Sequence, residues 1–366
     1  MSADKQLRVM IMAGGTGGHV FPALAVADQL RSGNAEISWL GTRAGIEADL
    51  IPKQNITLNF IDIEGVRGRG LLALLKAPLL LWRSVAQALA VLSDFRPQVV
   101  LGMGGFASGP GAVAAWLKRI PVVIHEQNSV AGTTNRLTAI VAKRVMQGFP
   151  NTLPKGEWCG NPVRTEISEL APPDQRFAGR SGKLRLLIVG GSRGALAINT
   201  LLPRALAEID PALRPEILHQ TGRAHWQQTI DLYDDEALGL ADSELSVVPF
   251  IDAMEKAYEW ADFVVCRAGA LTVAELTSAG LGALLIPFPF AIDDHQTANG
   301  QMLVDHGAAE MIQQSALTAA NLAAIIVGIA ADPDRRLAMA MSARALAKNQ
   351  AVQDVANVCR EVACGQ

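Results

Sequence analysis

The residues best suited to chemistry in this sequence are Thr272 and Glu275, which follow a turn of small residues. The turn, residues 267–270, interrupts an apolar run of strand character, and helical spacing continues from Leu271. Backbone N–H groups at a helix N-terminus favour anionic oxygens, so a phosphate would fit there, and Thr272 adds a hydroxyl. Glu275, one turn further, is placed to accept hydrogen bonds from two adjacent hydroxyls of a ribose. The alternative is structural: Thr272 caps the helix and Glu275 completes a capping box.

A glycine-rich loop near the N-terminus is the second stretch suited to binding a ligand. Residues 14–19 read Gly-Gly-Thr-Gly-Gly-His and follow an apolar run over 7–13 that predicts a buried parallel strand. Pro22 stands where the first turn of a helix tolerates proline, and residues 23–30 carry the helical pattern. Because glycines let a backbone approach a ligand closely, we expect this loop to cradle a phosphate or a sugar.

The first glycine loop does not match the common nucleotide-binding motifs. Its glycines fit the pattern G-x-G-x-x-G only at Gly15 and Gly17, and the next expected strand, residues 37–40, ends without an acidic residue for an adenosine ribose. His19 occupies the position after the glycines, where a Walker motif carries lysine. A nicotinamide or ATP site is therefore not expected.

Small or polar residues also follow the next expected strands, residues 58–63, 99–101 and 122–124. In an open parallel sheet, ligands bind beyond the carboxyl ends of the strands. We therefore expect His19, the glycines at 104 and 105, and the segment Glu126–Asn128 to converge. A histidine after a turn is by itself more often structural; Glu126 and Asn128 at a neighbouring strand end favour a functional His19.

A second strand, glycine loop and helix are expected at residues 184–189, 190–195 and 198–209. Backbone amides near Ser192 would suit a diphosphate, and Arg164 could add a guanidinium from the preceding linker. Further along, Gln296 and Asn299 share a helix face, and their amides both donate and accept, as the recognition of sugar hydroxyls requires. Asp293, just before them, would cap that helix.

Length and composition indicate two α/β domains. At 366 residues the chain exceeds the size at which one core usually keeps growing. The pattern breaks near residues 160–175, so we expect one domain of residues 1–162 plus a returning helix at about 348–366, and another of residues 163–347. The expected fold is two Rossmann-like, doubly wound domains facing each other across a cleft.

Charge and cysteine content exclude several classes of protein. The net charge of −3 provides no field for binding nucleic acid. The four cysteines have no Cys-x-x-Cys pair, which favours reduced thiols in the cytoplasm. We expect no signal peptide before the first strand and no transmembrane run.

The stretch over residues 65–83 is basic and rich in leucine, with four cations and no acidic residue. A core-facing helix with snorkelling cations is the structural interpretation. Its apolar residues are too many for one face, however, and a tryptophan beside an arginine is typical of an interfacial anchor. We therefore expect contact with an anionic membrane surface through Arg67, Arg69, Leu75, Lys76, Leu79, Trp82 and Arg83.

Seven motifs together resemble those of the bacterial N-acetylglucosaminyltransferases of peptidoglycan synthesis, a family of GT-B glycosyltransferases. They occupy residues 14–22, 102–105, 125–128, 160–164, 190–192, 267–272 and 294–296. They cover nearly the whole chain in the right order and spacing, which makes the resemblance highly specific.

The resemblance implies transfer of N-acetylglucosamine from UDP-N-acetylglucosamine to the 4-hydroxyl of the muramoyl sugar of lipid I, undecaprenyl-pyrophosphoryl-MurNAc-pentapeptide. The products would be lipid II and UDP, with inversion at the transferred sugar and without a cofactor or a metal. The implied location is the cytoplasmic face of the cell membrane, and other cell-wall synthesis proteins are further candidate partners. The basic leucine-rich stretch then has a purpose, because the acceptor's polyprenyl tail stays in the bilayer.

The resemblance also assigns residues by motif. Phe250 and Ile251 would wall the uracil, Glu275 would hold the ribose, Ser192 and Thr272 the diphosphate, and Gln296 the sugar. The donor site it implies comprises Thr16, Gly17, Gly18, Asn128, Arg164, Ser192, Ile251, Ala270, Leu271, Thr272, Val273, Ala274, Glu275 and Gln296.

A single displacement needs a base near the acceptor hydroxyl. His19 is the first candidate, because imidazole ordinarily titrates near neutral pH, and Glu126 is the rival or the group that orients it. Phe106 stands where relatives commonly carry an aromatic hydroxyl, which weakens any role for a phenol. Asp293 and Asp294 are not expected to bind a metal, because enzymes of this class stabilise the leaving diphosphate with a helix end and cations.

Two rival functions remain open from the sequence. A UDP-sugar 2-epimerase has the same two-domain architecture and the same donor, but it needs no lipid acceptor and no basic apolar surface. A non-catalytic, membrane-bound protein that senses UDP-N-acetylglucosamine is the other, and it would bind the donor without turnover.

Overall fold

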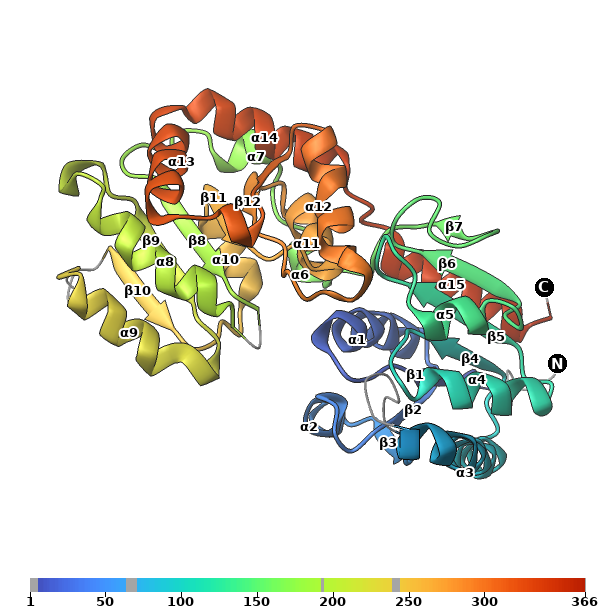
Figure 1. The fold of residues 1–366 in the computed structure, drawn as a ribbon. Coiled ribbons are helices and arrows are strands. Elements are labelled where there is room, and N and C mark those ends of the chain that lie inside the picture. The colour runs from blue at the N-terminus through green and yellow to red at the C-terminus, as the bar shows by residue number, and fades with distance from the viewer. Residues whose placement is uncertain (1–5, 64–70, 192–193, 239–243, 366) are drawn as a thin grey trace. The chain divides into compact units, whose positions relative to one another are not determined.

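A computed structural model describes residues 6–63, 71–191, 194–238 and 244–365 (Figure 1). The chain divides into two compact units. Unit 1 comprises residues 1–164 together with 349–366, and unit 2 comprises residues 165–348. Within the described residues, no helix is long and apolar enough to cross a membrane.

Unit 1 is built on one parallel sheet with the strand order β3-β2-β1-β4-β5-β6-β7. The strands are β1 (Arg8–Met12), β2 (Glu36–Gly41), β3 (Thr57–Phe60), β4 (Val99–Gly102), β5 (Val122–Glu126), β6 (Arg144–Gln147) and β7 (Glu157–Trp158). The helices are α1 (Gly17–Ser32), α2 (Glu47–Leu50), η1 (Pro52–Gln54), α3 (Leu71–Phe95), α4 (Ser108–Leu117), α5 (Thr133–Thr138) and α15 (Ala351–Ala363).

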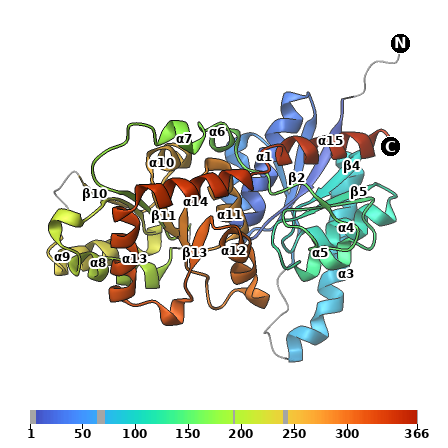
Figure 2. The same ribbon diagram turned by 90° about the horizontal axis from the view of Figure 1, so that it is seen from above.

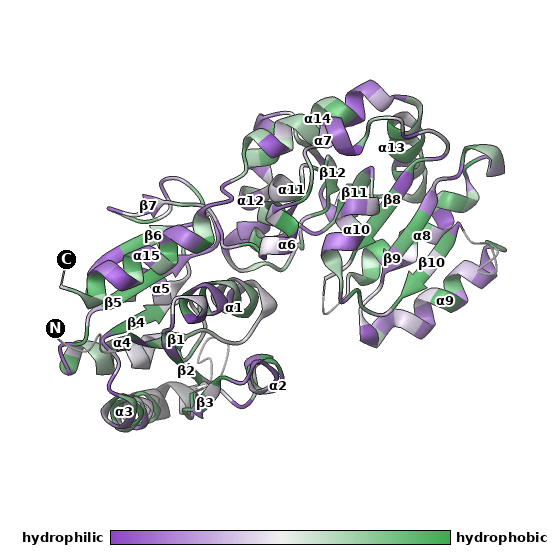
Figure 3. Ribbon diagram, turned by 180° about the vertical axis from the view of Figure 1, so that it is seen from behind, coloured by the Kyte–Doolittle hydropathy of each residue, from purple (hydrophilic) through white to green (hydrophobic). Residues whose placement is uncertain are grey.

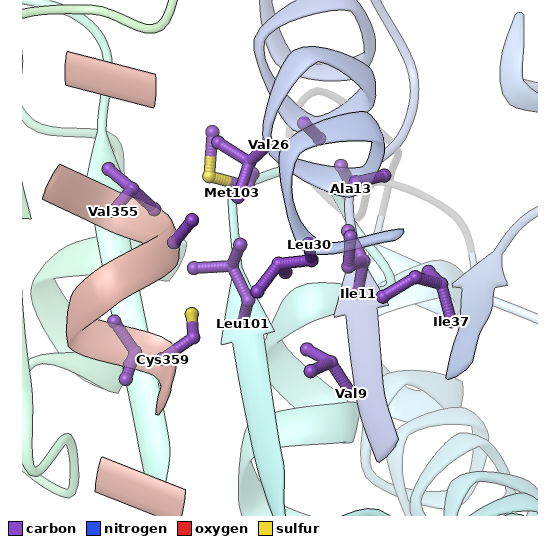
Figure 4. Close-up of a cluster of buried hydrophobic side chains, with 14 of the residues drawn as sticks. Val9, Ile11, Ala13, Val26, Leu30, Ile37, Leu101, Met103, Val355 and Cys359 are labelled. Carbon is purple, nitrogen blue, oxygen red and sulfur yellow. The ribbon is translucent and has the colours of Figure 1, made fainter. Parts of the chain in front are cut away.

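Alternating side chains of the central strands of unit 1 divide its core into two layers. Val9, Ile11 and Leu101 pack with α1 and α15 on one face (Figure 4), and Met10, Met12 and Val100 pack with α3 and α4 on the other. Because both faces are covered, β4 is apolar along its length and β1 is apolar after Arg8, as parallel strands usually are (Figure 3). The helix α15, at the end of the chain, lies beside α1 (Figure 2).

Unit 2 repeats this plan with the parallel strand order β10-β9-β8-β11-β12-β13. Its strands are β8 (Arg185–Val189), β9 (Glu216–Gln220), β10 (Leu245–Val248), β11 (Phe263–Cys266), β12 (Ala283–Leu285) and β13 (Ala309–Met311). Its helices are α6 (Thr165–Ser168), α7 (Pro173–Arg176), α8 (Leu196–Ala207), η2 (Pro211–Leu213), η3 (Arg223–His225), α9 (Trp226–Asp235), α10 (Met254–Trp260), α11 (Ala270–Ala279), η4 (Ile292–Asp294), α12 (His295–Asp305), η5 (Gln314–Ala316), α13 (Ala319–Ala331) and α14 (Pro333–Ala345).

Two local expectations from the sequence are wrong. Helix α1 begins at Gly17, so Pro22 is its sixth residue and does not stand in the first turn. The missing N–H of Pro22 therefore costs a hydrogen bond to the carbonyl of Gly18, close to the helix start. Strand β5 continues to Glu126, two residues beyond the apolar run, so His125 and Glu126 are buried strand residues.

Candidate active site

In each unit, a glycine loop follows a strand next to which the strand order reverses. The reversal lies between β1 and β4 in unit 1 and between β8 and β11 in unit 2. In unit 2, β8 and β11 are adjacent and parallel, β8 is followed by β9 on one side, and β11 by β12 on the other. The loops that follow β8 and β11 therefore lie side by side at the carboxyl edge, where such sheets bind ligands. In unit 1 the loops that follow β1 and β4 have the same relation.

The turn at residues 267–269 leads directly into helix α11. Gly269 is the N-cap residue, and Thr272 is the third residue of the helix, so Thr272 does not hold the capping position. The capping-box interpretation of Thr272 and Glu275 is therefore wrong. The amides of Leu271 and Thr272 lie in the first turn, where a helix has no carbonyl of its own for them, and the helix dipole adds positive potential there.

Glu275 lies in the second turn of α11 and is 8% exposed. The hydroxyl of Tyr258, on the neighbouring helix α10, donates a hydrogen bond of 3.0 Å to its Oε2. Tyr258 is fully buried, so this bond fixes the orientation of the carboxylate. Helix α11 thus offers two kinds of binding group. The backbone amides of its first turn donate hydrogen bonds to anions, and the carboxylate of Glu275 accepts them from hydroxyl groups.

Arg267 connects the loops that surround the start of α11. Its guanidinium donates to the carbonyls of Ile286 and Pro287, each at 3.1 Å, and to Oε1 of Gln314 at 2.6 Å. Its charge also lies 5.5 Å from the ring centroid of Phe288. Burial lowers the pKa of the Arg267 guanidinium. Sequence reasoning placed Arg267 in a motif but gave it no role; the signal was a cation directly after a buried strand.

The two amide residues of α12 have different surroundings. Gln296 is half-buried, and its Oε1 accepts a hydrogen bond of 2.9 Å from the backbone N–H of Phe288. Asn299 is fully buried, and its Nδ2 donates to the carbonyl of Ala268 at 3.3 Å. Asn299 thus supports the turn before α11 rather than presenting an amide at the surface. The N-cap of α12 is Asp294, not Asp293.

The expected uracil wall follows β10. The N–H of Ile251 donates to Oε1 of Gln220 at 3.0 Å, and the guanidinium of Arg223 lies 5.8 Å from the ring centroid of Phe250. Gln220, at the end of β9, is buried and was not found from the sequence. Ser192 and Arg193 lie outside the described residues. The remaining donor residues of unit 2, Ala270, Leu271, Val273 and Ala274, belong to the first turns of α11.

In unit 1, His19 lies where the two glycine loops meet. Its Nδ1 is 3.3 Å from Oγ1 of Thr16, the N-cap residue of α1. A Cβ atom at Gly104 would lie 2.8 Å from Nε2 of His19, and one at Gly105 would collide with the backbone of Gly14. Both Gly104 and Gly105 have positive φ, so only glycine fits there without strain. The loops that follow β1 and β4 thus contact each other at His19.

Glu126 is buried at the end of β5, and both of its oxygens accept hydrogen bonds. Oε1 accepts from the backbone N–H of Asn128 at 2.9 Å, and Oε2 accepts from Nδ2 of Asn135 at 2.9 Å and from the N–H of Gly132 at 3.1 Å. A carboxylate with these donors holds the loop over residues 127–135 in place. This arrangement favours a positioning role for Glu126 over that of a base.

The other expected residues of unit 1 lie around these loops. Gly17 and Gly18 are the first two residues of α1. Arg164 is half-buried and is the last residue of unit 1 before the chain enters unit 2.

Two fully buried histidines make the stability of the fold depend on pH. Burial lowers the pKa of His125 to about 4 and that of His219 to about 3. His125 bonds to the carbonyl of Gly160 at 2.8 Å, and His219 to the hydroxyl of Tyr233 at 3.0 Å. Both are therefore neutral at pH 7 in the folded state.

We expect the fold to lose stability as the pH falls. The folded pKa values lie below the unfolded value of about 6.5, so the stabilisation is complete above pH 6.5 and is lost as the pH falls towards 4. Between pH 7 and pH 5 each histidine should cost about 2 kcal/mol in the free energy of unfolding. Denaturant unfolding at both values measures it. His219→Gln should show a smaller dependence on pH than the wild type; an equal dependence would contradict the assignment.

Exposed apolar side chains gather on three neighbouring helices of unit 1. On α3, Leu79 and Trp82 are 68% and 69% exposed, and Arg83 pairs with Asp62 at 3.1 Å. Helix α3 packs against α4, which packs against α5. Further exposed apolar residues on or just after α4 and α5 are Val113, Trp116, Leu117, Leu137 and Ile140. Exposed cations beside them are Lys118, Arg119, Arg136 and Lys143.

We call these residues of α3, α4 and α5 the apolar–basic face. Sequence reasoning found its α3 part and missed α4 and α5. Of the expected contact residues, Arg67 and Arg69 lie outside the described residues. Leu75 and Lys76 lie within α3, but their side chains are outside the described part of the structure.

Two parallel sheets, each in its own unit and each with a glycine loop beside the point where the strand order reverses, are the architecture of the GT-B fold. Residues 9–147 match the glycosyltransferase family 28 N-terminal domain, and residues 185–358 match the C-terminal domain of that family. The chain belongs to glycosyltransferase family 28. This confirms the expected fold class and the resemblance read from the motifs.

Full-length relatives carry one name. Proteins of Nitrosococcus oceani and Cellvibrio japonicus, 51% and 52% identical, are called UDP-N-acetylglucosamine--N-acetylmuramyl-(pentapeptide) pyrophosphoryl-undecaprenol N-acetylglucosamine transferase. The alignments cover 98% and 99% of this chain and 99% and 100% of theirs. The crystal structure of Acinetobacter baumannii MurG matches with a TM-score of 0.82 and 42% identity, over 97% of this chain and 99% of that one.

A more distant structure shares the fold alone. The UDP-GlcNAc 2-epimerase of Neisseria meningitidis, bound to UDP-GlcNAc, matches with a TM-score of 0.63 at 14% identity. The alignment covers 98% of this chain and all of that one.

Proposed function

We propose that this protein transfers N-acetylglucosamine from UDP-N-acetylglucosamine to the 4-hydroxyl of the muramoyl sugar of undecaprenyl-pyrophosphoryl-MurNAc-pentapeptide. The products are lipid II and UDP, and the reaction serves peptidoglycan synthesis. The observation that carries this proposal is the alignment, at about half identity and over nearly the entire chain, with proteins named as this hexosyltransferase.

The donor is held mainly by unit 2 in this proposal. The first turn of α11, with Thr272 and the loop at Ser192, binds the diphosphate, and Glu275 accepts from the ribose hydroxyls. Phe250 and Ile251 flank the uracil, and Gln296 hydrogen-bonds to the sugar. Thr16, Gly17, Gly18, Asn128 and Arg164 are the donor contacts that unit 1 contributes.

The chemical step is a single displacement at the anomeric carbon of the donor sugar. His19 accepts the proton of the acceptor's 4-hydroxyl as that oxygen bonds to C1, and the bond from C1 to the diphosphate oxygen breaks. Thr16 orients the imidazole through Nδ1, so Nε2, beside Gly104, takes the proton. The negative charge that develops on UDP is stabilised by the start of α11.

Incorporation of labelled N-acetylglucosamine into a lipid I analogue, with UDP release followed in the same tube, tests this function. We expect label in the lipid and one UDP per sugar transferred. UDP or an epimerised sugar without labelled lipid would instead indicate the epimerase, and tight donor binding without any reaction would indicate a sensor of the donor.

We further propose that the apolar–basic face of unit 1 contacts the anionic surface of the cell membrane, on the cytoplasmic side. Two observations support this: the exposure of Trp82, Trp116 and Ile140, and the four exposed cations beside the α4 and α5 residues. The proposed acceptor, whose polyprenyl chain stays in the bilayer, would require such a contact. Each cation near an anionic surface contributes on the order of 1 kcal/mol.

The triple replacement Trp82→Ser, Trp116→Ser and Ile140→Ser should weaken binding to vesicles that contain anionic lipid. Burying a large apolar side chain contributes roughly 1.5–3 kcal/mol, so we expect at least a hundredfold loss in partitioning, measured by vesicle flotation. Turnover with a short-chain, soluble acceptor analogue should be retained. The control is Met341→Ser, which replaces an exposed apolar residue of unit 2. This variant should bind the vesicles as tightly as the wild type does. Unchanged binding by the triple variant would rule out this face.

A further inference from the structure

A buried carboxylate lies beneath the first glycine loop. Glu47, the first residue of the short helix α2, has no exposed surface. Its Oε2 accepts a hydrogen bond of 2.8 Å from the backbone N–H of Gly15. Its Oε1 accepts from the N–H of Thr42 at 2.9 Å and from Oγ1 of Thr42 at 2.8 Å. One side chain thus joins the loop that follows β1 to the end of β2.

Glycines surround this carboxylate because no larger residue fits. A Cβ atom at Gly14 would lie 2.8 Å from Cδ of Glu47, and one at Gly41 would lie 2.7 Å from its Cγ. A Cβ at Gly45 would overlap the carboxylate itself. Gly14 from the loop that follows β1, Gly41 at the end of β2 and Gly45 before α2 therefore pack against Glu47 and confine its side chain.

The contact continues from Glu47 to His19 along a short path. Gly15, which Glu47 holds, has φ of +87° and is followed by Thr16. Thr16 is the N-cap residue of α1, and its Oγ1 lies 3.3 Å from Nδ1 of His19. Gly14, on the other side of Gly15, packs against Gly105 in the loop that follows β4. A change at Glu47 is therefore transmitted to both loops that surround His19.

We propose that Glu47 is a positioning residue that sets the first glycine loop and, through Thr16, the orientation of the His19 imidazole. Its effect on turnover rests on the proposed function, whereas its effect on the His19 ring does not. Glu47→Gln tests it at constant size. The amide must turn its NH₂ toward the N–H of Gly15 or toward the Thr42 donors, so two donors meet where a donor and an acceptor met.

The first measurement is the NMR spectrum of the histidine rings. The chain has six histidines, and the His19 signal is assigned by its loss in His19→Gln. In Glu47→Gln we expect the His19 signal to move or split while the signals of buried His125 and His219 keep their positions. The control is Val355→Ala, a buried residue of α15, which destabilises unit 1 without touching the loop. It should leave the His19 signal unchanged.

The second measurement separates positioning from general instability. We expect Glu47→Gln to lower kcat by a factor of about 10 to 100, because a catalytic group that is misplaced by about 1 Å can cost up to this factor. In a His19→Ala background the same change should have almost no further effect, because the group that Glu47 positions is gone. At temperatures below its melting temperature, the Val355→Ala variant should have the same kcat as the wild type.

Several outcomes would overturn the proposal. An unmoved His19 signal, a kcat within threefold of the wild type, or losses that multiply fully with those of His19→Ala would each do so. Thr42→Val, which removes one of the three hydrogen bonds, gives the same readouts with smaller changes if Glu47→Gln does not fold. If the wild type transfers no sugar, the proposed function fails, and the NMR comparison still decides the role of Glu47.

Discussion

Replacing His19 with alanine should lower the turnover of sugar transfer by a factor of about 10² to 10⁴, the usual contribution of a general base. The physical reason is that the acceptor hydroxyl must lose its proton as it bonds to the sugar. His19 is the imidazole at the junction of both glycine loops of unit 1, oriented by Thr16. The measurement is kcat at saturating donor and acceptor, followed by UDP release.

Two comparisons make the His19 result specific. Thr16→Val keeps the imidazole and removes only the hydroxyl beside Nδ1, so its loss should be smaller than that of His19→Ala. Glu126→Gln should act through the loop over residues 127–135, whose amides its carboxylate holds, and should lower stability as well as turnover. If His19→Ala loses less than about tenfold in turnover, His19 is not the base.

The elements with strong local patterns were predictable from the sequence. Strands β4 and β11, and strands β1 and β8 after their first arginine, are apolar because helices cover both faces of each sheet, and glycine-containing turns follow them. The turn before α11 could be identified in this way. Pattern alone did not show that α1 begins at Gly17, since glycines and a proline usually argue against helix.

Contacts between distant segments were not predictable. Glu126 was assigned to a loop because the apolar run ends at Ile124; the donors that allow its burial come from residues 128, 132 and 135. Glu47 lies in a segment without clear periodicity, and its partner Gly15 comes from the loop that follows β1, 32 residues earlier in the chain. The apolar–basic face was identified on α3 alone because its other residues lie on separate helices that only the fold brings together.

Replacing Glu275 with alanine should weaken donor binding by a factor of about 10² to 10⁴. A hydrogen bond to a charged group contributes about 1.5–3 kcal/mol, and two adjacent ribose hydroxyls make two such bonds. These bonds are remote from the reacting carbon, so the KM for the donor should rise with little change in kcat. Calorimetric titration with UDP measures the binding loss directly.

A ribose analogue distinguishes this role of Glu275 from a structural one. The wild type should bind 2′,3′-dideoxy-UDP far more weakly than UDP, and Glu275→Ala should bind the two alike. If Glu275 serves only as the partner of buried Tyr258, the variant loses the 3.0 Å bond from that hydroxyl and has a lower free energy of unfolding, but its preference for UDP persists. Tyr258→Phe supplies the reverse case, since it removes the 3.0 Å bond and keeps the carboxylate, so its preference for UDP should survive. A preference that survives in Glu275→Ala would mean that other groups read the ribose, and the carboxylate would then be a structural feature of α10 and α11.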